Sequence, residues 1–309
     1  MATLSQMKTL ISILLLLAFV GSGCGAAPET ARRYATTINP LRAILAEVAG
    51  DRAEVVALVP PGASPHTYEP RPSDASAASA ALALFYAEQS IDAWAARLPA
   101  KHRIAMFAYV PEEMRLPWME THDHGDHEGH DHGDHAGHDH GDWDGHFWSD
   151  PLVVKAMLPA LSDQLASLDP EGAAIYRKNA TEFAAKLDAL DATLQHTFKE
   201  LTGRPVFMFH PSWNYFMHRY GLDVAGVIEP SPGKESTPKY IEGLIETARA
   251  RKVRAVFTEP QLPRRPADVL AAATGLPVFE LDPNGGTDGR RTYHELIDYN
   301  ASQLRSALE

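Results

Sequence analysis

The sequence holds one cysteine, Cys24, among its 309 residues, so an internal disulfide is excluded. Basic residues are also scarce. There are 28 Lys and Arg against 40 Asp and Glu, which gives a formal net charge of −12 with neutral His. A nucleic-acid partner needs a basic face to bind phosphate, and no basic stripe occurs, so that class of function is excluded. Beyond Val20 no segment is apolar enough to span a membrane.

The N-terminus has the pattern of an export signal. An apolar stretch from Leu10 to Val20 is too short to cross a bilayer and is followed by small residues. Cys24 comes directly after them, in a context that resembles a bacterial lipoprotein cleavage site. The sequence therefore predicts a signal peptide over residues 1–23, a lipid attached to Cys24 and a tether over residues 24–31. An ordinary signal peptide cut near Gly25-Ala26-Ala27 is the alternative. In both cases the mature protein is exported, to the periplasm or the cell surface.

Histidine and acidic residues are concentrated between Met119 and His146. No Lys or Arg falls between Arg115 and Lys155, and the imidazoles and carboxylates of this run are good ligands for divalent metals. A run with so few aliphatic side chains cannot build a packed core. We therefore predict a flexible His/Asp-rich loop over residues 120–145 that collects metal with low affinity and is accessory to a tighter site. Its histidines are His122, His124, His127, His130, His132, His135, His138 and His140.

Short apolar runs alternate with helical segments in both halves of the chain, which is typical of α/β folds with parallel sheets. The strand-like runs are 33–38, 54–58, 81–86, 104–108, 206–209, 224–228, 255–258 and 278–281. A long helix is predicted from Asp169 to Leu201, roughly 45 Å in length. We predict an α/β fold of two lobes, each with a parallel sheet, joined by one long helix. The N-terminal lobe covers residues 32–158, the linking helix 159–202 and the C-terminal lobe 203–309.

Four candidate ligands lie outside the His/Asp-rich loop or at its end, each directly after a strand or after residues that end regular secondary structure. His66 follows Ser64-Pro65, His146 closes the His/Asp-rich run, His210 follows a strand, and Asp282 follows another. Ligands of open parallel sheets bind beyond the carboxyl ends of the strands, so these residues predict a site in the cleft between the lobes. Three imidazoles and one carboxylate suit a four-coordinate Zn²⁺. From the residues alone, each is equally well explained as a helix cap, a core hydrogen-bonding group or, for Asp282, a turn residue.

Several segments resemble the cluster A-I solute-binding proteins of zinc and manganese ABC importers, in that family's order and spacing. They are PHTYEPRPSD, GHFWSDP, FHPSWNYFMHRYGL, GKESTPKYIEGLIETARARKVRAVFTEPQ and ELDPNGG, and the resemblance covers about residues 32 to 308. It implies two α/β lobes joined by one rigid helix. It also implies that His66, His146, His210 and Asp282 are the metal ligands.

The resemblance favours zinc over manganese. Members that look specific for manganese tend to have a carboxylate at the third ligand position, where this chain has His210, and nitrogen donors favour Zn²⁺ over the harder Mn²⁺. The His-rich loop is similar to that of the zinc members. This chain lacks the two cysteines that form a second-lobe disulfide in some of them. Glu259, at a strand end, is predicted either to orient an imidazole of the site or to be a plain loop acid.

The sequence therefore predicts an extracytoplasmic Zn²⁺-binding protein that delivers its ion to an ABC importer permease, with a metallochaperone as a further partner. Zn²⁺ is the transported ligand, Mn²⁺ the less favoured one, and a monomer is expected, attached to the membrane only by its lipid. An enzyme is not expected, because no HExxH helix motif for a zinc hydrolase occurs. A lipoprotein adhesin or a zinc scavenger of the same fold is the alternative.

Overall fold

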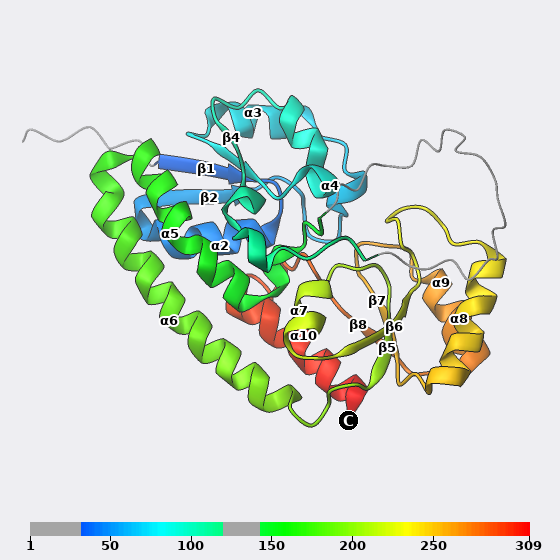
Figure 1. The fold of residues 1–309 in the computed structure, drawn as a ribbon. Helices are drawn as coiled ribbons and strands as arrows, with labels where there is room; N and C mark the ends of the chain where they lie inside the picture. Colours follow the sequence, from blue (N-terminus) through cyan, green and yellow to red (C-terminus); the bar gives the residue numbers. More distant parts are fainter. Residues whose placement is uncertain (1–31, 120–142) are drawn as a thin grey trace, which may run out of the picture. The chain divides into compact units, whose positions relative to one another are not determined.

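A computed structural model describes residues 32–119 and 143–309 (Figure 1). Three predicted segments lie outside the described residues: the signal peptide, the tether with Cys24, and nearly all of the His/Asp-rich loop with its eight accessory histidines. Among the described residues, no helix is both long and apolar enough to cross a membrane.

The N-terminal lobe is built on a four-stranded parallel sheet with the order β2-β1-β3-β4. Its strands are β1 (Arg32–Thr36), β2 (Ala53–Ala57), β3 (Leu84–Tyr86) and β4 (Arg103–Ala105). Its α-helices are α2 (Asn39–Ala49), α3 (Pro72–Ala80) and α4 (Gln89–Asp92). Each strand overlaps an apolar run that the sequence predicts, although β1, β2 and β4 begin one residue before it.

The C-terminal lobe repeats this arrangement with a parallel sheet of order β6-β5-β7-β8. Its strands are β5 (Pro205–Met208), β6 (Asp223–Val227), β7 (Val256–Thr258) and β8 (Val278–Glu280). Its α-helices are α7 (Asn214–Arg219), α8 (Pro238–Arg251), α9 (Arg265–Thr274) and α10 (Tyr293–Leu308). Helices α8 and α9 cover one face of this sheet (Figure 1). The prediction of two α/β lobes with parallel sheets is confirmed.

The predicted linking segment, residues 159–202, is not one helix. Helix α5 (Pro151–Leu168) fills its first part, and the long helix α6 (Ala173–Phe198) follows a short turn, η7 (Pro170–Gly172). The break arises because Pro170 lacks a backbone N–H and Asp169 leaves helical geometry, with φ −140° and ψ 84°. The 26 residues of α6 correspond to a helix about 39 Å long, somewhat shorter than predicted.

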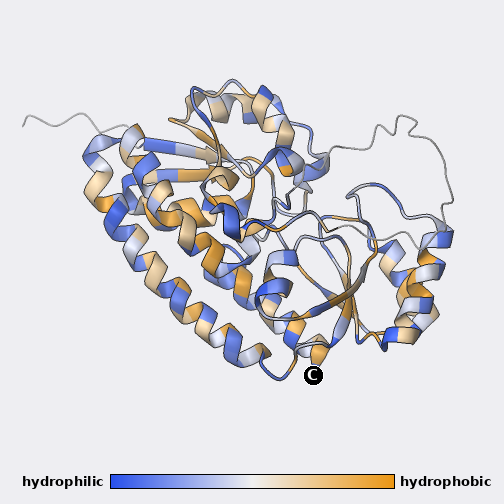
Figure 2. Ribbon diagram, viewed as in Figure 1, coloured by the Kyte–Doolittle hydropathy of each residue, from blue (hydrophilic) through white to orange (hydrophobic). Residues whose placement is uncertain are grey.

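A continuous apolar core joins the two lobes. Buried residues of α6 recur at spacings of three and four, which places them on one face of the helix, while its hydrophilic residues alternate with them along its length (Figure 2). Helix α10 of the C-terminal lobe packs against both α2 and α6. The main core cluster includes Leu45 and Phe85 from one lobe and Phe216 and Leu304 from the other. Separating the lobes would expose this core, so large relative motion is disfavoured.

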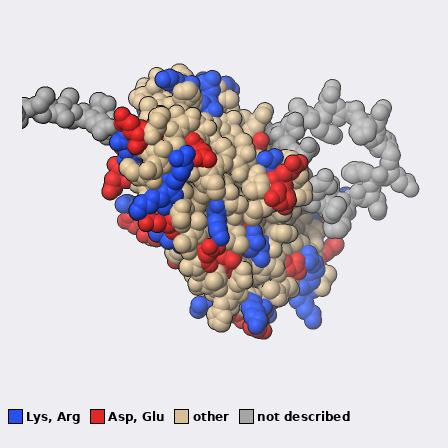
Figure 3. Space-filling model, turned by 60° about the vertical axis from the view of Figure 1, so that its left-hand side comes forward, with Lys and Arg blue, Asp and Glu red and all other residues tan. Residues whose placement is uncertain are grey.

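Basic and acidic side chains are interspersed on the face that α6 brings forward (Figure 3). Many of them are paired, as in Lys155–Asp188 at 2.6 Å and Lys186–Glu47 at 2.8 Å. Such exposed pairs contribute little to stability, typically about 0.2–1 kcal/mol each. This surface therefore has no extended field of one sign.

Candidate metal centre

Three of the four predicted ligands are brought together by the fold. His66 lies in the short helix η2 (Pro65–Thr67), His146 caps η6 (Phe147–Ser149), and His210 comes two residues after β5. Their potential ligand atoms all lie within 4.8 Å of one another. His146 and His210 are 1% and 4% exposed. Two of these residues come from the N-terminal lobe and one from the C-terminal lobe, so the site bridges the lobes.

The spacing of the imidazole nitrogens matches the edge of a zinc tetrahedron. The Nε2 atom of His146 lies 3.3 Å from Nε2 of His66 and 3.4 Å from Nε2 of His210. A tetrahedral Zn²⁺ with Zn–N bonds of about 2.05 Å places its nitrogens about 3.3 Å apart. The ring centroids are 5.2–5.4 Å apart in all three pairs. The three Nε2 lone pairs can therefore converge on one ion with little rearrangement.

His146 is oriented by Asp144, a residue that the sequence did not single out. Asp144 is completely buried, and its Oδ1 atom accepts hydrogen bonds from both Nδ1 (2.7 Å) and the backbone N–H (2.9 Å) of His146. A proton on Nδ1 leaves Nε2 with its lone pair free for a metal. This carboxylate–histidine arrangement fixes the ring and raises the basicity of the ligand nitrogen. The signal was the Asp-Gly-His spacing at the end of the loop, which the surrounding acidic residues obscured.

His210 has a similar carboxylate partner in Glu259. Its Nδ1 atom lies 2.6 Å from Oε2 of Glu259, which follows β7 and is 3% exposed. The other carboxylate oxygen, Oε1, accepts a hydrogen bond from Ser212 Oγ at 2.9 Å. Glu259 therefore lies where an orienting residue for His210 would lie, and the same turn after β7 carries Gln261.

Another buried carboxylate, Glu229, lies near His210. It follows β6, is 2% exposed and accepts a hydrogen bond from the Gly233 backbone N–H at 3.4 Å. Burial raises the pKa of Glu229, and the hydrogen bond from the Gly233 backbone acts in the opposite direction. No pattern in the sequence singles out Glu229, because its position at the end of a strand is shared by many turn residues.

Asp282, the predicted fourth ligand, is not part of the histidine cluster. Its Oδ1 atom accepts hydrogen bonds from Gln261 Nε2 (2.7 Å) and from the backbone N–H groups of Asn284 (3.1 Å) and Gly285 (2.9 Å). Its Oδ2 atom forms an ion pair with Arg290 at 2.9 Å. In this arrangement both carboxylate oxygens contact protein groups, and among residues 32–119 and 143–309 the cluster of close potential ligand atoms consists of the three imidazoles. That Asp282 is a ligand stays a prediction.

The two ends of the His/Asp-rich loop lie beside the histidine cluster. Pro117 and Trp143 form an isolated antiparallel bridge, and the Asp144 backbone N–H donates to Leu116 O at 2.8 Å. Tyr215, from the C-terminal lobe, accepts from the Leu116 backbone N–H and donates to Asp144 O, both at 3.0 Å. The described segments on either side of the His/Asp-rich loop therefore lie next to each other, and the second one includes Asp144, two residues before His146.

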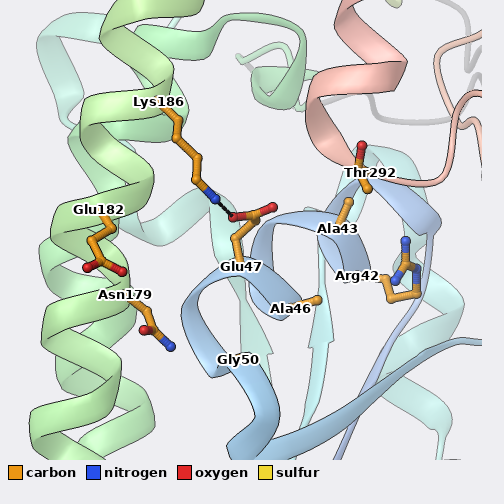
Figure 4. A pocket seen from close by; sticks show the side chains of 9 residues that line it. All are labelled: Arg42, Ala43, Ala46, Glu47, Gly50, Asn179, Glu182, Lys186 and Thr292. Carbon is orange, nitrogen blue, oxygen red and sulfur yellow. Dashed lines mark hydrogen bonds and ion pairs between the residues drawn. The ribbon is translucent and has the colours of Figure 1, made fainter.

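A hollow of about 300 Å³ lies elsewhere, between α2, α6 and the start of α10 (Figure 4). Lys186 and Glu47 pair across it, and its other charged residues, Arg42 and Glu182, are also partnered. None of the clustered histidines lines it. Its chemistry therefore does not compete with the histidine cluster as the functional site.

Comparison with known families agrees with this geometry. The sequence profile of the family described as "Zinc-uptake complex component A periplasmic" matches residues 35–307. The "High-affinity zinc uptake system protein ZnuA" of Brucella abortus is 31% identical over 332 residues, which cover 98% of this chain and 99% of the relative.

Two further relatives extend the comparison. The "Manganese ABC transporter substrate-binding lipoprotein PsaA" of Streptococcus mitis is 25% identical over 312 residues, covering 96% of each chain. The structure titled "Crystal structure of ZnuA" has a TM-score of 0.75 and 28% identity, and covers 90% of this chain and 100% of its own.

Proposed function

Since the chain belongs to the family of periplasmic zinc-uptake component A proteins, we propose that it captures Zn²⁺ between His66, His146 and His210 and delivers it to a membrane permease. It is a solute-binding component of an ABC importer, works outside the cytoplasm and is not an enzyme. The observation that carries the assignment of the ligands is the 3.3–3.4 Å spacing of the Nε2 atoms.

Capture requires no covalent chemistry. The incoming ion exchanges water for three imidazole nitrogens. Asp144 orients the ring of His146 by a hydrogen bond, and the Glu259 carboxylate lies 2.6 Å from Nδ1 of His210. Because ligand imidazoles must be unprotonated, binding releases protons at low pH, and affinity falls as the medium is acidified. The shared apolar core opposes wide opening of the lobes, so we propose that release to the permease involves local movement of the ligand loops.

The nitrogen donors of the proposed site favour zinc over manganese. Three imidazoles suit Zn²⁺ better than Mn²⁺, which prefers oxygen. Mn²⁺ is the alternative ligand, because one relative is named as a manganese transporter component. We further propose that Cys24 carries a lipid that attaches the protein to the membrane surface. A monomeric state and a metallochaperone partner stay predictions from the sequence.

Replacing each clustered histidine tests the proposed ligand set. His66→Ala, His146→Ala and His210→Ala should each lower Zn²⁺ affinity by at least about 100-fold, because losing a ligand costs more than losing an orienting residue. His218→Ala, on α7 and exposed, is the matched control. Affinity is measured by competition with a chelator, with thermal unfolding as a check on the fold. Wild-type affinity in all three folded variants would contradict the proposal.

A further inference from the structure

Helix α7 of the C-terminal lobe is joined to the segment of the N-terminal lobe that carries His146. Tyr215 and Arg219 stand four residues apart on α7, so their side chains lie on the same face of the helix. The Tyr215 hydroxyl donates to the carbonyl of Asp144 at 3.0 Å. The Nε atom of Arg219 lies 2.8 Å from Oδ2 of Asp150. One face of α7 therefore contacts both ends of this segment, and η6 within it packs against the same helix.

The buried carboxylate of Asp150 serves two elements at once. Its Oδ1 atom caps α5 by accepting from the backbone N–H groups of Leu152 at 2.8 Å and Val153 at 3.4 Å. Its Oδ2 atom pairs with Arg219, whose side chain is only 27% exposed. Salt screens such a partly buried pair less than it screens a surface pair. The pair is therefore a link between the lobes, separate from the cap of α5.

Helix α7 is also tied to His210 and to the long helix α6. His210 lies just before α7, in a turn where the Ser212 backbone N–H donates to the His210 carbonyl at 2.8 Å. At the other end of α7, the Tyr220 hydroxyl donates to Oδ1 of the buried Asp191 on α6 at 3.0 Å. Because the connection to His210 is short and hydrogen-bonded, the position of α7 fixes the position of that histidine.

We propose that Tyr215 and Arg219 are positioning residues, which hold His146 against His210 before the ion arrives. This inference rests on the proposed function. The two histidines belong to different lobes, and a tetrahedral Zn²⁺ needs their Nε2 atoms about 3.3 Å apart, close to the observed 3.4 Å. A site whose ligands are already in place binds more tightly, because less conformational freedom is lost on binding.

The test is a double-mutant cycle on the Zn²⁺ affinity of the full-length protein, measured by chelator competition. Its variants are Arg219→Gln, Asp150→Asn and the protein with both substitutions. Asp150→Asn removes the ion pair but keeps Oδ1 as the cap of α5. Each single substitution should lower affinity about 10-fold and the double no further, because both break the same link. Losses that multiply to about 100-fold, or an affinity within about twofold of wild type in folded Arg219→Gln, overturn the proposal.

Arg52→Gln is the matched control for a loss of stability alone. The Nε atom of Arg52 lies 2.9 Å from Oδ2 of the buried Asp169, and the Arg52 side chain is 18% exposed. Asp150 and Asp169 stand at opposite ends of α5, about 27 Å apart. Arg52→Gln should therefore lower the unfolding temperature and leave Zn²⁺ affinity unchanged. An equal loss of affinity in Arg52→Gln and Arg219→Gln overturns the proposal, because general destabilisation would then explain both.

Tyr215→Phe gives a second readout that does not require Arg219→Gln to fold. It removes one hydroxyl from the same face of α7, so Zn²⁺ affinity should fall about fivefold. An unchanged affinity in folded Tyr215→Phe overturns the proposal. Failure of the proposed function is distinguishable, because then the three histidine variants would bind Zn²⁺ as wild type does.

Discussion

Asp144→Asn is the perturbation that isolates the electrostatic support of the site. The substitution keeps the size of the side chain, and Oδ1 can still accept from Nδ1 and the backbone N–H of His146. Oδ2 is buried with no hydrogen-bond partner among the described residues, so the amide replaces it without displacing a donor. What is lost is the negative charge 2.7 Å from the ring nitrogen, and with it the added basicity of Nε2.

The expected loss of Zn²⁺ affinity is 10- to 100-fold, the usual effect of removing such a partner, or about 1.4–2.7 kcal/mol. Chelator competition at neutral pH measures it. Asp188→Asn, which removes a carboxylate from an exposed ion pair with Lys155, is the control and should leave affinity unchanged. Glu259→Gln should reproduce the loss from the other lobe. The reasoning is refuted if Asp144→Asn binds Zn²⁺ within twofold of wild type while its unfolding temperature is unchanged.

Three further predictions concern stability. Tyr215→Phe should lower the free energy of unfolding in urea by about 1–3 kcal/mol, because it removes the hydroxyl that hydrogen-bonds Leu116 N–H and Asp144 O. An unchanged free energy of unfolding would mean that these two hydrogen bonds do not stabilise the ends of the His/Asp-rich loop. Leu187→Ala, at a fully buried position of α6, should cost about 2–5 kcal/mol in the same assay, and a cost below 1 kcal/mol would contradict the packing described. Burial raises the pKa of Asp92 to about 7 from its ordinary 3.8, so the folded state favours the protonated carboxyl. The free energy of unfolding of the wild type therefore falls as pH rises from about 4 to 7, because the carboxyl then ionises in the unfolded chain. The free energy of unfolding of Asp92→Asn should therefore rise relative to that of the wild type as pH increases from about 4 to 7. A difference between the two proteins that does not change with pH would refute this.

The strands were predictable because each is a short apolar run between breakers, and burial in a covered parallel sheet requires that composition. The three histidines were predicted as ligands from the resemblance to the family, because the residues alone explained each equally well as a cap or a core hydrogen-bonding group. Only His210 comes shortly after a strand, as the rule for parallel sheets expects. The partner of His146 was not, since Asp144 lies among many acidic residues and only the fold shows which one is buried. The pairing of Asp282 with Arg290 depends on the turn between them, whose path the sequence does not reveal. The break between α5 and α6 was visible at Pro170, and the segment predicted as the linking helix, residues 159–202, contains the end of α5 as well as α6.

The most direct test is a Zn²⁺ titration of the chain in which residues 121–142 are replaced by a short Gly/Ser linker. The antiparallel bridge between Pro117 and Trp143 brings the two ends of the replaced segment close together, so a short linker can join them. If the three histidines form the capture site, the shortened protein retains one tight Zn²⁺ site with an affinity within about threefold of the full chain, and loses only weaker binding. Disappearance of the tight site would contradict the account, because it would place the high-affinity ligands in the loop.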